Sequence, residues 1–239
     1  MISPVDPRND LAEAADQYWR QSAALPWVQD MSHWRGRGRW ADDGAWQNVG
    51  IKHVELFRQL CVLSGRETPV RTMLEWGPGG GANAVAFAGQ VVRYYGVDIS
   101  PANLQECGRQ LDAIGYKTFR PIEIDANSPE ASLASIESPV DFVLCTAVFQ
   151  HFPSKAYSER VMRVFHRALA DDGIALVQTR YDDGSDVLRC KNSDYEKNVV
   201  TFTSYRVEEF WHVAAEAGFQ PISVVLWPEP CYAFYMLKK

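Results

Sequence analysis

Residues 75–84 decide how this chain folds, and they read Glu-Trp-Gly-Pro-Gly-Gly-Gly-Ala-Asn-Ala. An apolar run precedes the stretch and small helix-favouring residues follow it. Glycine tolerates backbone conformations that other residues avoid, and it lets a ligand approach the main chain closely. A glycine-rich turn between a strand and a helix is typical of sites that hold the polar part of a cofactor. The stretch therefore predicts a strand, a ligand-facing turn and a helix.

From residue 70 onward, short apolar runs rich in β-branched and aromatic residues alternate with helical patterns. The expected strands are 70–77, 91–100, 118–125, 141–149 and 173–180, and the expected helices are 82–89, 101–115, 157–173 and 207–219. This alternation predicts an α/β fold with a doubly wound, parallel sheet. Two closing strands, 222–227 and 231–239, are separated only by Pro-Glu-Pro, so they must pair antiparallel.

The segment 1–69 has a different character and is expected to be helical and irregular. It contains helical patterns at 11–21 and 49–65 and five of the chain's eight tryptophans, which are Trp19, Trp27, Trp34, Trp40 and Trp46. These rings either anchor the segment on the core or form a stacking wall for a ring-shaped or sugar substrate. We predict that 1–69 is an N-terminal helical lid or substrate region. The polar segment 181–204 is predicted to be an acceptor-side insertion in a Rossmann-like domain at 70–239.

Composition excludes several classes of protein. The formal net charge is -6, which argues against a nucleic-acid partner or an anionic membrane surface. No run of 18 apolar residues is present and the first ten residues lack a secretory pattern, so no membrane span or signal is expected. The five cysteines are widely spaced without a C-x-x-C motif, which favours reduced thiols in a cytoplasmic protein.

The glycine turn alone fits two classes of cofactor. Gly77, Gly79 and Ala82 match the G-x-G-x-x-A pattern of dinucleotide-binding proteins. Glu75 begins a second pattern, E-x-G-x-G-x-G, which continues through Gly77, Gly79 and Gly81. Asp98 lies at the end of the next strand, 21 residues after Gly77, where a carboxylate can bind ribose hydroxyls. NAD and S-adenosylmethionine both contain adenosine, so Asp98 fits both patterns.

Three further features favour the second pattern. Asp125 ends the third strand, where its side chain can contact an adenine amino group. The fourth strand runs into Phe-Gln-His-Phe-Pro at 149–153, which places a histidine at the crevice. A charged turn with glycine leads into the fifth strand, and the closing hairpin follows. An NAD-dependent oxidoreductase does not need these features together, and it would usually need a second region for its substrate.

On these motifs the sequence resembles the class I S-adenosylmethionine-dependent methyltransferases over residues 70–239. The resemblance implies a seven-stranded sheet in the order 3-2-1-4-5-7-6 with strand 7 antiparallel. It also implies S-adenosyl-L-methionine as cofactor and a role for each matching position. Glu75 would lie near the methionine amino group, and Thr146 and Ala147 would line the methionine side. The backbone of Gly77, Gly79 and Gly81 would pass close to methionine and ribose, and Asp98 would hold the ribose. Ile99 would pack on the adenine, and Asp125, beside Ala126, would bind the adenine amino group. Trp76 and Pro78 depart from the family's turn without changing its spacing.

Methyl transfer from a sulfonium is an in-line displacement, so the protein mainly positions the nucleophile and excludes water. A hydroxyl acceptor also needs a base. His151 is the candidate, because imidazole titrates near neutrality and this one follows the fourth strand. The alternative is that His151 is structural and hydrogen-bonds the loop.

The acceptor is read from weaker signals. Tyr181, Asp182 and Trp46 are predicted to contact it. The acidic turn at 181–186 could bind Mg²⁺, hold sugar hydroxyls or simply be solvated, so a metal requirement is left open. The absence of an Asn- or Asp-Pro-Pro-Tyr run after the fourth strand counts against amino-group methylation of nucleobases. We therefore expect O-methylation of a small hydroxylated acceptor such as a sugar or glycosylated metabolite. The alternatives are a phenol, amine or carboxylate methylated by positioning alone and, more distantly, an NAD-dependent oxidoreductase or a non-catalytic cofactor-binding protein.

Overall fold

The computed structural model describes residues 7–66, 68–191 and 193–239, so residues 1–6 and 67 of the predicted lid and residue 192 of the predicted insertion lie outside it. Within the described chain, one sheet has the strand order β3-β2-β1-β4-β5-β7-β6. β7 runs antiparallel to both of its neighbours, and the other pairs are parallel. This arrangement confirms the predicted fold class.

The strands follow the predicted runs closely. They are β1 (Thr72–Trp76), β2 (Arg93–Asp98), β3 (Phe119–Glu123), β4 (Val140–Cys145), β5 (Leu169–Arg180), β6 (Gln220–Trp227) and β7 (Tyr232–Lys238). β5 begins four residues earlier than predicted, in the charged stretch expected to be a turn. Leu169 is buried there and pairs with Val140 of β4 before the register shifts, so packing extends the strand.

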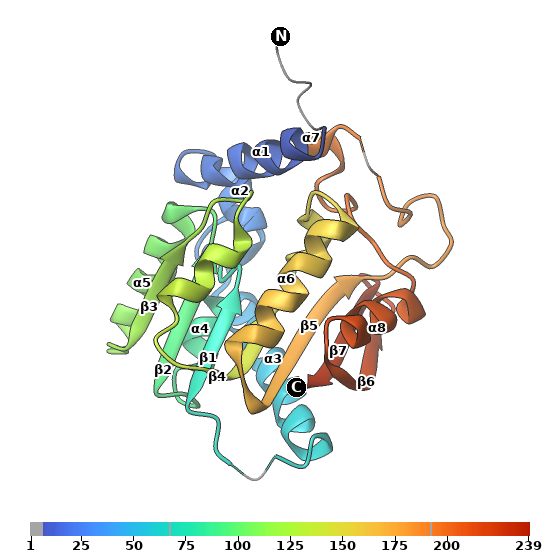
Figure 1. Cartoon of the computed structure of the whole chain (residues 1–239). Helices are drawn as coiled ribbons and strands as arrows, with labels where there is room; N and C mark the ends of the chain where they lie inside the picture. Colours follow the sequence, from blue (N-terminus) through green and yellow to red (C-terminus); the bar gives the residue numbers. More distant parts are fainter. Residues whose placement is uncertain (1–6, 67, 192) are drawn as a thin grey trace.

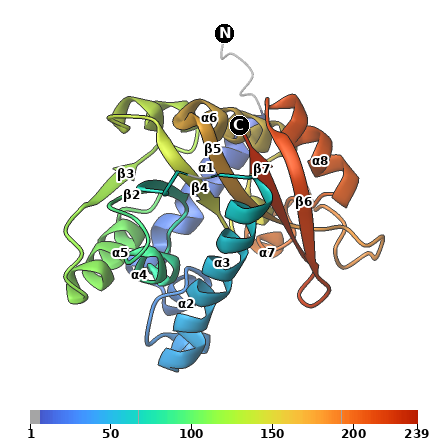
Figure 2. The ribbon, with the colours of Figure 1, turned by 90° about the horizontal axis from the view of Figure 1, so that it is seen from below.

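Helices cover both faces of the sheet, with α3, α4 and α5 on one side and α6 and α8 on the other (Figure 2). The helices are α1 (Pro7–Arg20), α2 (Pro26–Met31), α3 (Asp43–Leu63), α4 (Ala82–Phe87), α5 (Pro101–Ala113), α6 (Lys155–Ala168), α7 (Tyr195–Asn198) and α8 (Val207–Glu216). α3 begins six residues before its predicted start, because Asp42 caps it by accepting a hydrogen bond from the Ala45 amide. None of the described helices is long and apolar enough to cross a membrane.

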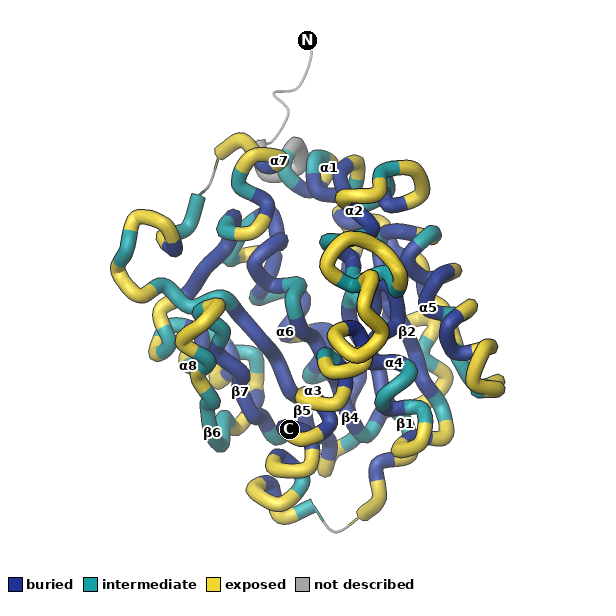
Figure 3. The backbone as a smooth tube through the Cα atoms, turned by 180° about the vertical axis from the view of Figure 1, so that it is seen from behind, coloured by how far each residue is buried: buried dark blue, intermediate teal, exposed yellow. Residues whose placement is uncertain are grey.

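Two hydrophobic cores lie on opposite faces of the sheet, and the central strands contribute to both. In β1, Met73 packs under α3 and α4, whereas Leu74 packs under α6. In β4, Phe142 likewise belongs to the core under α3 and α4, and Val143 belongs to the core under α6. The central strands are consequently buried along most of their length (Figure 3). Burial on both faces explains why these strands are continuous apolar runs rather than alternating ones.

The N-terminal helix α1 lies across the carboxyl ends of the strands, beside α7 (Figure 1). A small aromatic cluster joins the two helices, in which Tyr18 of α1 packs against Tyr195 and Phe202 lies beneath. Since the carboxyl edge of a doubly wound sheet is where its ligands bind, the N-terminal segment and the segment after β5 together cover the edge that concerns function.

Candidate active site

The glycine turn after β1 is tightly enclosed. Gly77, Gly79 and Gly81 all have positive φ angles, of 73°, 50° and 84°. A Cβ atom on Gly77 would lie 2.5 Å from a methyl group of Val148, and one on Gly79 would lie 2.4 Å from the Ser32 carbonyl oxygen. Both the backbone conformation and the space therefore require glycine. The contact with Ser32, which follows α2, was not predicted from the sequence.

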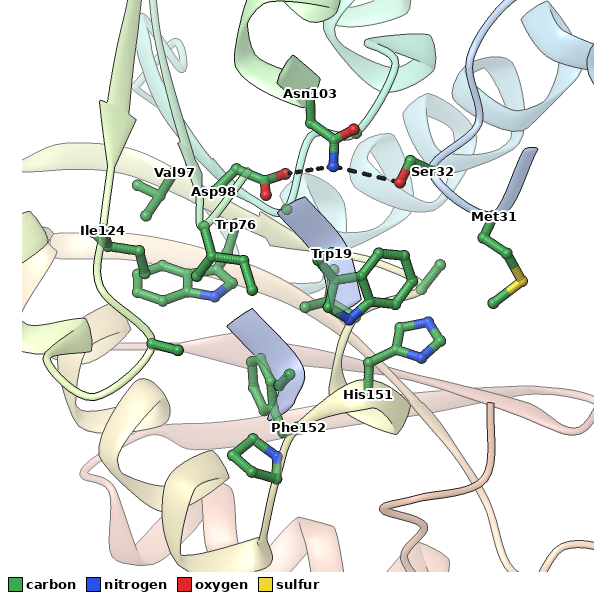
Figure 4. Close-up of a pocket in the computed structure, with 18 of the residues that line it drawn as sticks. Trp19, Met31, Ser32, Trp76, Val97, Asp98, Asn103, Ile124, His151 and Phe152 are labelled. Atoms are coloured by element: carbon green, nitrogen blue, oxygen red, sulfur yellow. Dashed lines mark hydrogen bonds between the residues drawn. The ribbon is translucent and has the colours of Figure 1, made fainter. Parts of the chain in front are cut away.

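Asp98 at the end of β2 is 8% exposed and faces a cavity (Figure 4). Its carboxylate accepts hydrogen bonds from the Ser100 amide at 2.8 Å and from the Asn103 side chain at 3.4 Å. Asn103 also donates to the Ser32 hydroxyl at 3.3 Å, so the N-terminal segment is linked to this carboxylate. Burial raises the pKa of Asp98 to about 6, and these hydrogen bonds oppose the rise. Asp98 does not cap α5, because Ser100 does so.

The hollow beside Asp98, here called the inner cavity, contains about 730 Å³ of empty space, counting the part that is open to solvent. Its walls are mainly apolar (Figure 4). They include Trp76, Val97, Ile99, Ile124, Ala126 and Phe152. Of the predicted adenine contacts, Ile99 and Ala126 line this cavity. Asp125 is exposed at its rim, does not line it, and accepts a hydrogen bond from the Asn127 amide at 2.7 Å.

Glu75 lies on the other side of the glycine turn and is 1% exposed. Its carboxyl group accepts a hydrogen bond from Asn83 at 2.7 Å and is also contacted by the Tyr94 hydroxyl. Asn83 donates to the Thr146 hydroxyl at 3.0 Å, and its carbonyl oxygen lies 2.7 Å from Nδ1 of His53. Burial raises the pKa of Glu75 to about 8. The group is therefore largely protonated at pH 7, and a cation placed beside it would favour its ionisation.

Glu75 and Asn83 line a second hollow of about 1120 Å³, here called the outer groove. It runs between α3, the end of β5 and the turn that joins β6 to β7. Residues that line it include Arg39, Trp40, Lys52, His53, Gln178, Trp227, Tyr232 and Phe234. The inner cavity and the outer groove share four lining residues, which are His33, Gly77, Thr146 and Ala147. The predicted methionine-side residues thus mark the boundary between the two hollows.

His151 lies in a short 3₁₀ turn after β4, lines the inner cavity and is 8% exposed. Its Nδ1 atom is 2.6 Å from the Val199 carbonyl oxygen, and its ring meets the edge of Trp19 with centroids 4.7 Å apart. Burial lowers the pKa of His151 to about 4, so the ring is neutral at pH 7. A neutral ring that donates from Nδ1 leaves Nε2 unprotonated. The structure thus shows the hydrogen bond to the loop that a structural histidine would make, and it also leaves Nε2 able to accept a proton.

A chain of hydrogen bonds links the lid, the segment after β5 and the His151 turn. The Trp19 indole donates to the Tyr195 hydroxyl at 3.0 Å, and that hydroxyl donates to the His151 carbonyl at 2.6 Å. All three residues line the inner cavity. Trp19 was predicted only as one of several tryptophans, and no sequence pattern distinguishes Tyr195.

The residues predicted to contact the acceptor line neither hollow. Trp46 is buried, and its indole donates to the His33 carbonyl at 2.7 Å. Tyr181 packs against the core, and Asp182 closes a turn by accepting a hydrogen bond from the Gly184 amide at 2.8 Å. The chain turns away after Asp182 and returns beside α1, so Tyr195 reaches the cavity instead. In the described part of the chain, no three acidic, histidine or cysteine side chains are grouped to hold a metal ion.

The comparisons with known proteins agree with the family that these motifs indicate. The model of a methyltransferase domain family matches residues 45–224, well over half of the chain. The chain belongs to this methyltransferase family. The match begins within α3 and ends in β6, so it includes the glycine turn, Asp98 and His151.

Solved structures show the same fold for this methyltransferase. An S-adenosylmethionine-dependent methyltransferase from Clostridium acetobutylicum ATCC 824 is 13% identical with a TM-score of 0.60, covering 77% of this chain and 89% of that one. The N-methyltransferase NodS from Bradyrhizobium japonicum WM9, in complex with S-adenosyl-L-homocysteine, is 14% identical with a TM-score of 0.58, covering 77% and 86%. The mycolic acid cyclopropane synthase CmaA1, also with S-adenosylhomocysteine, is 12% identical with a TM-score of 0.56, covering 77% and 84%. No curated protein matches the sequence.

These findings establish a class I methyltransferase whose cofactor is S-adenosylmethionine. The residues of the site fit that cofactor chemically. An apolar cavity beside the buried Asp98 suits adenosine, and a buried carboxyl group beyond the glycine turn suits an ammonium group. The relatives named above include an N-methyltransferase and a cyclopropane synthase, so the shared fold leaves the acceptor atom open.

Proposed function

We propose that this methyltransferase transfers a methyl group to a hydroxyl of a small polar acceptor, with the cofactor spanning the glycine turn. The observation that carries the proposal is the pair of buried carboxyl groups, Asp98 in the inner cavity and Glu75 in the outer groove. They match the two polar ends of S-adenosylmethionine, which are the ribose hydroxyls and the methionine ammonium. The two carboxyl groups support an orientation in which the ribose lies in the inner cavity and the methionine ammonium lies in the outer groove.

In this proposal, Asp98 accepts hydrogen bonds from the ribose, and Ile99 and Ala126 pack on the adenine. Asp125 at the rim accepts from the adenine amino group, for which its exposed position is suitable. The methionine end passes Thr146 and Ala147 to reach Glu75, since these two residues line both hollows. Positive φ angles and closely packed protein neighbours require glycine at these three positions, so the turn keeps the conformation along which this path runs.

The cofactor supplies an electrophilic methyl group on a sulfonium. His151 accepts the proton of the acceptor hydroxyl at Nε2, because Nδ1–H is committed to the Val199 carbonyl. A histidine pKa of about 4 makes Nε2 a weak base, so the proton leaves late, when the attacking oxygen has become acidic. Residues 1–69 act as the lid and 181–204 as the insertion that closes on it, and the Trp19–Tyr195 hydrogen bond supports both roles. Together the two segments exclude water from the reacting atoms.

The first test is calorimetric binding of S-adenosylhomocysteine to the wild type and to Asp98→Ala. Asp112→Ala is the matched control, because this carboxylate is exposed and, among the residues that the structure describes, forms an ion pair only with Lys117. We expect Asp98→Ala to abolish measurable binding and Asp112→Ala to leave it unchanged. If the wild type binds no S-adenosylhomocysteine, the proposed cofactor site is wrong. A screen for transfer of a labelled methyl group to sugars, phenols and amines, with and without Mg²⁺, then tests the hydroxyl acceptor.

A further inference from the structure

The outer groove has a local charge opposite to that of the whole protein. The chain carries a net charge of -6, yet the described residues that line the groove include Lys52 and Arg39 and a single acid, Glu75. Glu75 is buried, and burial raises its pKa to about 8, so it contributes little negative charge at pH 7. Because Arg39 is paired with Asp30, the positive charge of the groove comes from Lys52, and such a charge attracts anions.

Lys52 is the cation available to a ligand. Arg39 pairs with Asp30 at 2.9 Å, whereas none of the ion pairs among the described residues involves Lys52. Lys52 is exposed, and its ammonium group lies 5.7 Å from the centroid of the Trp227 ring. This contact holds the charge over an aromatic surface without neutralising it.

Gln178 of β5 offers an unused hydrogen-bond donor in the same groove. It is 1% exposed, and its Oε1 accepts a hydrogen bond from the Ala147 amide at 3.0 Å. That contact fixes the orientation of the side-chain amide, because only the oxygen can accept from an N–H. Nε2 is buried and has no hydrogen-bond partner among the described residues. A buried donor without a partner is unfavourable, so a ligand oxygen beside it would be stabilised.

Aromatic rings line the space between these two groups. The Trp227 and Phe234 rings pack with centroids 4.4 Å apart, and the buried His53 ring lies nearly parallel to Trp227 at an interplanar angle of 10°. Tyr232 extends this surface by packing edge-on against Phe234. Rigid rings of this kind offer a flat apolar surface that a planar ligand can cover.

We propose that the outer groove is the acceptor subsite and that it selects a planar, hydroxylated aromatic acid. The ring of the acceptor lies along Trp227, its carboxylate pairs with Lys52, and its hydroxyl oxygen accepts a hydrogen bond from Nε2 of Gln178. Ala147, which holds Gln178, lines both hollows, so this oxygen lies at the boundary between them, next to the path proposed for the methionine end of the cofactor. The hydroxyl proton leaves across this boundary to the proposed base His151, which lines the inner cavity. The inference rests on the proposed O-methyltransferase function and names its acceptor class.

The test compares the binding of 4-hydroxybenzoate and 4-hydroxybenzamide to protein saturated with S-adenosylhomocysteine, measured by ligand-observed NMR titration. The two probes have nearly the same shape and differ in charge. We expect the wild type to bind the benzoate about threefold more tightly, which is the size usual for an ion pair with an exposed lysine. Lys52→Met should remove this preference, and Lys117→Met, which changes an exposed lysine paired with Asp112, should preserve it. Gln178→Glu keeps an oxygen that accepts the hydrogen bond of the Ala147 amide and replaces the Nε2 donor, so it should weaken the binding of both probes.

Three results would overturn the inference while leaving the cofactor site intact. They are equal binding or no binding of the two probes by the wild type, an unchanged preference in Lys52→Met, or unchanged binding of both probes to Gln178→Glu. A fourth is a tenfold loss of S-adenosylhomocysteine affinity in Lys52→Met, since the lysine would then belong to the cofactor's own carboxylate. Failure of the wild type to bind S-adenosylhomocysteine at all would instead refute the proposed function.

Discussion

Glu75 should make cofactor binding release a proton, and this can be measured without knowing the acceptor. Its carboxyl group is buried, hydrogen-bonded to Asn83 and proposed to face the methionine ammonium. Burial raises the pKa of Glu75 to about 8, so about nine in ten molecules carry the proton at pH 7. The ammonium group stabilises the charged form, and binding should therefore release about 0.9 proton at pH 7.

The same linkage predicts how affinity depends on pH. A group that must lose a proton in order to bind favours binding as the pH rises towards its pKa in the free protein. For a pKa of about 8, the ionised fraction of Glu75 rises roughly eightfold between pH 6.5 and 7.5. The affinity for S-adenosylhomocysteine should rise by the same factor. Asp98 adds little to this change, because burial raises its pKa only to about 6 and it is mostly ionised in this window.

Titration calorimetry in buffers with different ionisation enthalpies counts the released protons directly. Glu75→Gln keeps the shape of the side chain and removes its titration, so its proton release should fall close to zero and its affinity should become nearly independent of pH. Equal proton release by the wild type and Glu75→Gln would refute the reasoning. Absence of release from the wild type would refute it as well, since the carboxyl group would then already be ionised or would not face the ligand.

Three other perturbations test separate parts of the site. Tyr195→Phe removes the hydroxyl between the Trp19 indole and the His151 carbonyl, and should lower the free energy of unfolding in urea by about 1–3 kcal/mol; a loss below about 0.5 kcal/mol would contradict the linking role. His151→Asn keeps an N–H for the loop carbonyl, and should lower the rate of methyl transfer to a hydroxyl acceptor about 100-fold or more with S-adenosylhomocysteine affinity unchanged; a near-normal rate would exclude His151 as the base. Gly79→Ala places a Cβ 2.4 Å from a lid carbonyl at a φ of 50° and should cost about 1–3 kcal/mol of stability along with cofactor affinity, whereas Gly89→Ala, which meets nothing within 4 Å, should be neutral in both assays.

The sheet and the family could be predicted because their signals are local in the chain. Apolar runs of strand length and the helical patterns between them specified the order of elements, and the closing Pro-Glu-Pro required an antiparallel final pair. Asp98 was predicted from its distance to Gly77, because one βαβ unit fixes that spacing. The errors at the start of α3 and of β5 are also local, and they occurred where a cap or a buried leucine extended an element beyond its pattern.

The residues that cover the site could not be predicted in the same way. Trp19 and Trp46 belong to the same tryptophan-rich segment, yet only Trp19 lines the inner cavity, and Trp46 is buried beneath the lid's own backbone. In the segment after β5, Tyr195 reaches the cavity and Tyr181 does not. No sequence pattern distinguishes Gln178 from other residues of a buried strand. Its proposed role depends on Nε2, which has no hydrogen-bond partner among the described residues because the Ala147 amide pairs with Oε1.

By itself, then, the sequence determined the fold and the glycine turn, because both follow from periodicity and from spacings within strand–helix units. The class of cofactor followed from the ordered set of motifs along the chain and from the family that this set resembles. Only the tertiary structure decided which side chains of the lid, of β5 and of the segment after it meet at the carboxyl edge. Those contacts join residues as far apart in the chain as Trp19 and Tyr195. They depend on how whole elements pack, and no short-range pattern in the sequence records that packing.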